Sequence, residues 1–89
     1  MKIKEGFVVE KVGNAYLAVA VGERADSFNA LIRMNSTGAY IWEKLAERDM
    51  TEGELLAVMK AEYDAPEELL LRDISAFVNK LREGGLLDD

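Results

Sequence analysis

The segment that most restricts the fold is "NALIRMNSTGAYIWEKL", residues 29–45, in which a strand-like apolar run passes directly into a helix-like segment. The run stops at Asn35, and Asn35 or Ser36 offers a short side-chain oxygen that can accept a hydrogen bond from the free amides of a first helical turn. Gly38 falls inside that turn, where glycine costs about 1 kcal/mol relative to alanine, so we expect a close backbone contact there. The fold must therefore join a strand to a helix without an intervening loop.

The first half of the chain predicts an antiparallel sheet. The runs "GFVVEKV" and "AYLAVAV" are rich in β-branched and aromatic residues, and only Gly13-Asn14 separates them, which favours a tight hairpin. In the second run Leu17, Val19 and Val21 share one face, so we expect this large apolar face to cover the core. The polar segment "GERADS" is expected to be a loop, and a third strand near "FNALIRMN" completes a three-strand meander.

The second half predicts three helices. The first begins at the Asn35-Ser36 cap, the capping box "TEGE" at 51–54 begins the second, and the third begins after Pro66 and ends at Gly84-Gly85. Helical spacing gives the expected buried faces, which are Ile41, Trp42 and Leu45, then Leu55, Leu56, Met59 and Tyr63, and then Leu70, Ile74, Phe77 and Leu81. We therefore predict one α+β domain over residues 1–89, with a three-stranded antiparallel sheet followed by three helices.

The composition excludes most catalytic chemistry. The 89 residues include no Cys and no His, which removes thiolate nucleophiles, the usual zinc and iron–sulfur ligands and the side chain most often used for proton transfer. Acidic residues such as Glu43 and Glu54 fall on expected polar helix faces and indicate a solvated surface, and the glycines lack the spacing of a phosphate-binding loop. We therefore expect no enzyme activity, no metal site and no cofactor.

The charge and the apolar runs limit the partners and the location. A formal net charge of −6, without a cluster of Lys and Arg in the sequence, argues against a nucleic-acid partner. The N-terminal segment "MKIKEGFVVE" lacks the long apolar run of a signal peptide, and the longest apolar stretch, "AYLAVAV", has the length of a strand rather than of a membrane span. We expect a cytoplasmic protein with no membrane partner.

The third strand is an edge of the expected sheet, and an extended peptide could add to it as a further strand. About four added backbone hydrogen bonds contribute roughly 2–6 kcal/mol, whereas association alone costs about 4 kcal/mol or more, so an apolar wall must supplement the edge. On the third helix, Leu71 and Val78 form a second apolar line bordered by Ser75 and Arg82. We expect this line to form the margin of a groove, and the alternative is that it completes the core.

Several segments, taken in order, resemble the PqqD family. The family is named for the pyrroloquinoline-quinone biosynthesis protein D and is related to the recognition elements of ribosomally made, post-translationally modified peptides. The resemblance rests on "DSFNALIRMNSTGAYIW", in which Asn35, Thr37 and Gly38 precede the aromatic pair Tyr40 and Trp42, and then on "TEGELL", "EYD" and "DISAFVNKLREGGLL". It covers nearly the whole chain.

The resemblance implies a winged-helix-like domain that binds the leader segment of a precursor peptide and presents the core segment to a modifying enzyme, often a radical-SAM enzyme. The leader is expected to add as a strand beside the third strand and to pack against the third helix. The peptide-binding residues implied are Asn29, Ala30, Leu31, Ile32, Arg33 and Met34 on the strand, and Leu71, Ser75, Val78, Asn79 and Arg82 on the helix. The direct strand-to-helix step would then preform the groove, so that less ordering is lost on binding.

Two other classes of function stay open at the level of the sequence. A winged-helix architecture suggests DNA binding, although the expected second helix, residues 52–63, contains a single Lys. Either free edge of the sheet could instead serve protein interaction or the formation of a homodimer.

Overall fold

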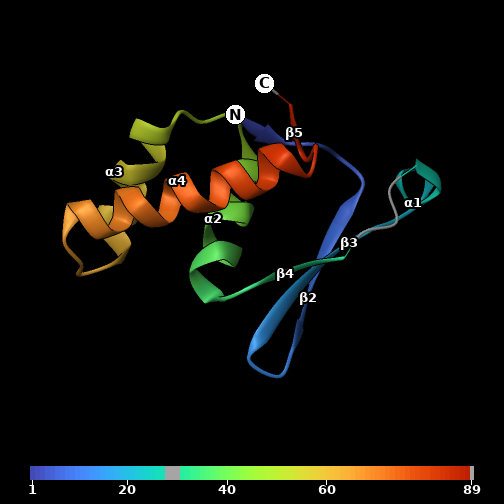
Figure 1. Ribbon diagram of the computed structural model, residues 1–89, viewed down its shortest axis with the longest axis horizontal. Helices are drawn as coiled ribbons and strands as arrows, with labels where there is room; N and C mark the ends of the chain where they lie inside the picture. The colour runs from blue at the N-terminus through green and yellow to red at the C-terminus, as the bar shows by residue number, and fades with distance from the viewer. Residues whose placement is uncertain (28–30, 89) are drawn as a thin grey trace.

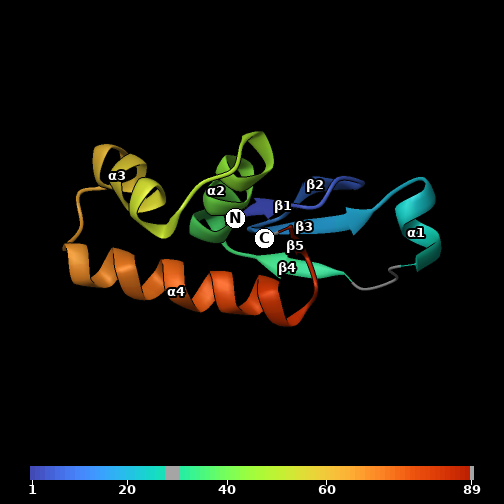
Figure 2. The same ribbon diagram turned by 90° about the horizontal axis from the view of Figure 1, so that it is seen from above.

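The three long helices lie at one end of the molecule, and the three-stranded sheet and a short helix lie at the other (Figure 1). The computed structural model describes residues 1–27 and 31–88. In chain order the elements are β1 (Lys2–Ile3), β2 (Phe7–Val12), β3 (Ala15–Ala20), α1 (Glu23–Ser27), β4 (Ile32–Met34), α2 (Ser36–Glu47), α3 (Glu52–Glu62), α4 (Glu67–Glu83) and β5 (Leu87–Asp88). Figure 2 shows α4 along one side of the molecule, with β4 between β3 and the C-terminal half of α4.

The three-stranded sheet has the order β2-β3-β4, and both of its strand pairs are antiparallel. Gly13 turns the β2–β3 hairpin with a φ of +62°, next to the pair formed by Val12 and Ala15. The predicted meander is therefore confirmed, and β4 is one of its two edge strands. Residues 28–30 of the run expected to form the third strand lie outside the described residues.

The sheet covers the core with the opposite face from the one expected. Ala18 is fully buried, and Phe7 and Tyr16 on the same face pack against the core, whereas Val21 is 41% exposed. The indole of Trp42 in α2 contacts the Phe7 ring edge-on, with ring centroids 5.7 Å apart. A small residue at position 18 leaves room for the large side chains that the helices contribute. The prediction that Leu17, Val19 and Val21 cover the core is therefore wrong.

The ends of α3 and α4 follow the sequence signals. The Thr51 hydroxyl accepts a hydrogen bond from the amide of Glu54, and the Glu54 carboxylate accepts one from the amide of Thr51, which confirms the capping box. α4 begins after Pro66 and ends before Gly84-Gly85, as predicted. The second glycine has a φ of +72°, a backbone conformation that residues with a side chain rarely adopt.

Three short elements add to the predicted order of three strands and three helices. β1 and β5 form a second, two-stranded antiparallel sheet in which Lys2 lies opposite Asp88 and Ile3 opposite Leu87. The segment expected to be a loop contains α1, which follows Gly22. Strands of two residues and a helix of five are too short to produce a recognisable hydrophobic period, so the sequence pattern does not reveal them.

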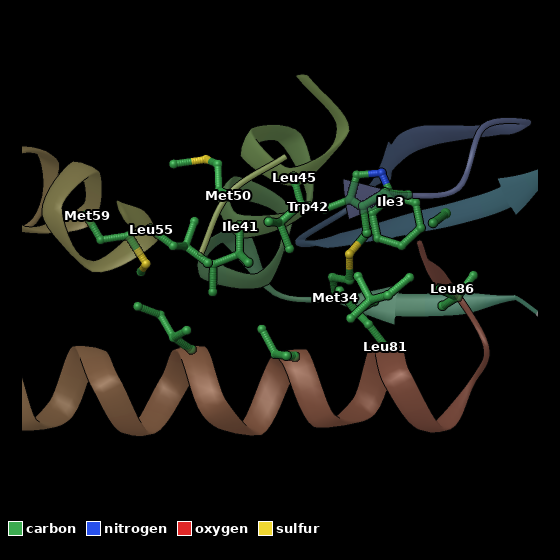
Figure 3. Close-up of a cluster of buried hydrophobic side chains, with 14 of the residues drawn as sticks. Ile3, Met34, Ile41, Trp42, Leu45, Met50, Leu55, Met59, Leu81 and Leu86 are labelled. Atoms are coloured by element: carbon green, nitrogen blue, oxygen red, sulfur yellow. The ribbon is translucent and has the colours of Figure 1, made fainter. Parts of the chain in front are cut away.

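One apolar cluster connects the three long helices with both sheets. Figure 3 shows Met34 of β4 between Trp42 of α2 and Leu81 of α4. Among the described residues no polar or charged residue is buried. The buried residues are Ile3, Ala18, Met34, Ile41, Trp42, Leu45, Met50, Leu55, Met59, Leu70, Ile74, Val78, Leu81, Leu86 and Leu87. The cluster fixes β4 and α4 in one rigid framework because both contribute to it.

Candidate functional site

One edge of β4 has no neighbouring strand within the described part of the chain. β4 pairs with β3 through Met34 opposite Tyr16 and through Ile32 opposite Ala18. In an antiparallel pair, the backbone N–H and C=O groups of successive residues point alternately toward the partner strand and away from it. The carbonyl of Arg33 accepts a hydrogen bond from a side chain of α4, which assigns Arg33 to the set that points away. The backbone of Arg33 therefore faces the open edge.

The open edge of β4 continues directly into the first turn of α2. Asn35 keeps an extended backbone, with a φ of −84° and a ψ of −179°, and its Oδ1 accepts a hydrogen bond from the amide of Gly38 at 2.8 Å. Of the two residues expected to cap this helix, Asn35 is therefore the N-cap, and Ser36 is the first residue of α2. Because the strand direction is maintained up to the cap, the edge and the start of α2 form one continuous wall.

Gly38 allows α4 to approach this wall closely. Gly38 is buried, and a β-carbon added to it would lie 3.0 Å from Cε1 and 3.3 Å from Cδ1 of Phe77. Carbon atoms that are not bonded pack best at about 3.5–4.0 Å, so any side chain here would displace the ring. The close contact expected at Gly38 is therefore confirmed, and its partner is an aromatic ring of α4.

Two adjoining clefts lie between this wall and α4, with volumes of about 490 and 270 Å³. Asn35, Phe77 and Lys80 line both of them, so the two clefts share a boundary. We call the combined feature the β4–α4 groove. Its other lining residues are Asn14, Ala15, Arg33 and Met34 in the larger cleft, and Thr37, Gly38, Ile41, Asp73 and Ala76 in the smaller one.

A lysine of α4 spans the larger cleft. The Lys80 ammonium donates a hydrogen bond to the carbonyl oxygen of Arg33 at 2.9 Å. Within the described residues the ion pairs join the Met1 amino group with Asp49, Arg48 with Glu54, and Lys60 with Glu67, so Lys80 takes part in none of them. Its hydrogen-bond partner in the groove is thus a neutral backbone carbonyl.

The predicted strand residues meet the groove in part. Arg33 and Met34 line it, and Ile32 is half-buried against the core. Leu31 precedes β4 and is 56% exposed. The remaining two predicted residues, Asn29 and Ala30, lie outside the described residues. Contact of these residues with a peptide stays a prediction.

The predicted helix residues lie on a different face of α4. Val78 is fully buried in the core, whereas Phe77, which was expected in the core, is half-buried and lines the groove. Leu71 is 40% exposed and lies outside the groove. The residues predicted from the resemblance but absent from the groove lining are Leu71, Ser75, Val78, Asn79 and Arg82. Contact of the exposed ones with a peptide stays a prediction.

The groove face of α4 consists of Asp73, Ala76, Phe77 and Lys80, which recur at helical spacing. A successive rotation of about 100° per residue places this face on one margin of the buried stripe and the predicted face on the other margin. Helical periodicity identifies the stripe but not which margin adjoins the strand. One signal was available, because a glycine inside a helix indicates a close neighbour and Phe77 is the aromatic residue of α4.

The groove offers binding groups of several kinds. The Phe77 ring and Met34 provide apolar surface, the side chain of Asn14 provides amide groups, and Lys80 and Asp73 provide opposite charges. The described residues contain no group of three or more acidic residues placed to hold a metal ion. No described helix combines the length and the apolar character needed to cross a membrane.

Comparison with known proteins agrees with this architecture. No curated protein sequence matches the chain. The fold is similar to that of TbiB1 in complex with the TbiA(beta) leader peptide, with a TM-score of 0.71 and 22% sequence identity over 99% of this chain and 95% of that chain. Residues 17–87, which include β4, α2 and α4, match the family described as coenzyme PQQ synthesis protein D (PqqD). The chain therefore belongs to the PqqD family.

Proposed function

We propose that the domain binds the leader segment of a ribosomally made precursor peptide as an additional strand on β4 and holds it for a modifying enzyme. Membership of the PqqD family supports this function, as does the similarity in fold to TbiB1, which is in complex with a leader peptide. The observation that carries the proposal is that the open edge of β4 adjoins a groove whose lining includes the Phe77 ring. The edge supplies backbone partners, and the groove supplies side-chain pockets.

The affinity requires both parts of this surface. Each backbone hydrogen bond at Arg33 and at Leu31, two residues earlier on the same edge, contributes about 0.5–1.5 kcal/mol. Association costs about 4 kcal/mol or more, which such bonds barely offset. An apolar leader side chain buried against Phe77 adds roughly 1.5–3 kcal/mol. We therefore expect leaders with a strand-forming segment and apolar residues at alternate positions, because alternate side chains of the added strand face α4.

The groove is largely formed before a peptide arrives. The Asn35 cap fixes the step from β4 to α2, and the contact between Gly38 and Phe77 fixes α4 against it. Fewer groups then lose conformational freedom on binding, which leaves more of the contact energy as affinity.

In this proposal the chemistry belongs to a partner enzyme. The chain has no Cys and no His, so its own side chains supply neither thiolate nor imidazole chemistry. The resemblance points to a radical-SAM enzyme or another peptide-modifying enzyme as the partner. The domain's contribution is to raise the local concentration of the precursor beside that enzyme.

The test is a titration followed by NMR at each backbone amide, with candidate leader peptides encoded near the gene for this chain. We expect shifts concentrated at residues 32–34 and at residues 73–80 of α4. Shifts confined to the opposite edge, β2, would contradict the proposed site. An unperturbed spectrum at near-millimolar concentrations of every candidate would contradict leader binding.

Proline variants separate the two edges of the sheet. Arg33→Pro removes the outward N–H of β4 and leaves the bonds of Ile32 and Met34 to β3 in place. Lys11→Pro is the matched control. Lys11 lies opposite Tyr16 on β2, and its N–H points away from β3 at the other edge of the sheet. Like Arg33→Pro, this change removes one positive charge. We expect Arg33→Pro to abolish binding and Lys11→Pro to retain it. Arg33→Ala separates the loss of the charge from the loss of the N–H.

A further inference from the structure

The hydrogen bond from Lys80 to Arg33 occupies an acceptor that an added strand needs. The Arg33 carbonyl points to the open edge of β4, and the Lys80 ammonium bonds to it at 2.9 Å. A leader strand on this edge would donate a backbone N–H to the same oxygen. Lys80 therefore has to move or to share the carbonyl when a strand adds.

Lysine at a free strand edge is a known device against unwanted pairing. Here the lysine comes from the neighbouring helix and reaches the edge itself, across 47 positions of the sequence. A strand that displaces the ammonium without replacing its partner leaves a cation at a partly desolvated interface, which is unfavourable. A strand that brings its own anion removes this cost.

The charges around the groove favour such an anion. The larger cleft is lined by the cationic Lys80, and its described lining contains no acidic residue. Asp73, which lines the smaller cleft, lies seven positions before Lys80, about two helical turns away. The chain as a whole carries a net charge of −6, so this cleft is a locally cationic site on an acidic protein.

Building on the leader-binding function, we propose that Lys80 is a specificity-determining residue that disfavours the addition of neutral strands to the β4 edge and selects leader segments carrying an acidic side chain on the side that faces α4. On binding, the ammonium leaves the Arg33 carbonyl and pairs with the leader carboxylate, while the leader backbone N–H takes its place on the carbonyl. The leader class is thus an extended segment with apolar residues and one Asp or Glu in the same alternating set.

The register of the sheet determines which leader positions qualify. Residues directly opposite each other on antiparallel strands share a face, and Ile32 and Met34 lie on the face of Tyr16 and Ala18 that covers the core. α4 packs on that face. The selected acid must therefore lie opposite Ile32 or Met34 and not opposite Arg33, whose side chain shares the outer face with Leu17.

The test is a selection of short random peptides displayed on phage against three proteins: the unmodified chain, Lys80→Met and the control Lys60→Met. Methionine keeps the length and the apolar stem of lysine without the charge. Lys60 lies on α3, pairs with Glu67 and lies outside the groove lining, so its variant matches the change in net charge. Peptides enriched by the unmodified chain are then synthesised with Glu or Gln at the selected position and, as a peptide control, at an adjacent, outward-facing position.

We expect the unmodified chain and Lys60→Met to enrich an acid at a fixed spacing from the apolar positions, and to bind the Glu peptide about two- to fivefold more tightly than the Gln peptide, as for an exposed ion pair. Lys80→Met should lose this preference and bind the Gln peptide more tightly than the unmodified chain does. Exchanging Glu for Gln at the outward-facing position of the peptide should change its affinity little for any of the three proteins.

The two levels of the proposal fail differently. If strand-forming peptides bind at residues 32–34 with no acidic preference, or with one that Lys80→Met retains, the role of Lys80 is wrong and leader binding stands. If none of the three proteins enriches a peptide that shifts the amides of β4, leader binding fails and the role of Lys80 fails with it.

Discussion

Phe77 packs so closely on Gly38 that a β-carbon at position 38 would lie 3.0 Å from the Cε1 atom of its ring. The glycine lies in the first turn of α2, directly after the open edge of β4, and the aromatic residue lines both clefts of the groove. This one contact therefore determines how far α4 stands from the edge to which a peptide would add.

Gly38→Ala should weaken peptide binding and lower stability modestly. Displacing the Phe77 ring costs about 2 kcal/mol as overpacking, and alanine recovers about 1 kcal/mol of helix propensity. We expect the free energy of unfolding to fall by about 1 kcal/mol, measured by urea denaturation. The affinity for a leader peptide should fall further than this difference in stability explains, because the ring moves into the groove.

Gly53→Ala is the matched control for this change. Gly53 also lies in the first turn of a helix, but a β-carbon there would meet only Thr51 Oγ1, at 3.8 Å. We expect this variant to be up to about 1 kcal/mol more stable and to bind peptide normally. If the two alanine variants had the same stability and the same peptide affinity, the proposed role of the contact between Gly38 and Phe77 would be wrong.

Introducing a glutamate on one margin of α4 or on the other tests whether the peptide binds the groove face or the face that the resemblance predicts. Ala76 is exposed and lines the groove, whereas Leu71 is exposed on the other margin. We expect Ala76→Glu to fold normally and to lose most of its peptide affinity, and Leu71→Glu to keep both, as measured by circular dichroism and fluorescence titration. The reverse result would place the peptide on the predicted face.

Val78→Glu should unfold the domain rather than affect binding selectively. The side chain of Val78 is fully buried among Ile74, Leu81 and the other core residues. A carboxylate there has no hydrogen-bonding partner, and burying it costs several kcal/mol, a large share of the roughly 5–15 kcal/mol that stabilises a small domain. Thermal unfolding should show a transition that is strongly lowered or absent, and Val78→Ala should lose about 1–3 kcal/mol while staying folded. A stable Val78→Glu variant would be inconsistent with this packing.

The capping box of α3 makes stability depend on pH on the acid side. The pKa of Glu54 is lowered, chiefly because its carboxylate accepts a hydrogen bond from the backbone amide of Thr51. Since the folded pKa lies below the ordinary value of 4.5, the stabilisation is complete above that value and is lost as the pH falls through the lowered pKa. Glu54→Gln should flatten this dependence, measured by denaturation at a series of pH values.

Glu52→Gln is the control for the capping box, because it removes the same charge from the same turn and leaves the Thr51–Glu54 bonds in place. This variant should retain the steep loss of stability at acid pH. Asp49, whose pKa is lowered mainly by a hydrogen bond from the Met1 amino group, titrates in the same direction in both variants, so only their difference reports on the capping box.

The sequence predicted the elements that carry strong local signals. The hairpin at Gly13-Asn14, the cap at Asn35 and the capping box at Thr51 are each specified by a few adjacent residues, and the structure confirms them. The buried stripe of α4 was predicted with one exchange, because Val78 is fully buried in it and Phe77, its neighbour in the sequence, is only half-buried. Local chemistry and periodicity were sufficient for these features.

The remaining features depend on contacts between distant parts of the chain. The covered face of the sheet was decided by the helices, whose large side chains require the small Ala18 opposite them. The groove margin of α4 was decided by the side on which β4 lies, and the bond between Lys80 and Arg33 spans 47 positions. None of these features is visible in the pattern of a single segment. The sequence could therefore predict the edge strand and the amphipathic helix, but not which face of the helix lies beside the strand.

The pairing of β1 with β5 brings the two ends of the described chain together, with Lys2 opposite Asp88. A domain whose ends are adjacent can be inserted into a surface loop of another protein without being stretched, and it tolerates circular permutation. Both connections would leave from one short ribbon, so neither has to cross the surface of the domain. The architecture thus suits use as a transplantable cassette within a host protein as well as use as a separate subunit.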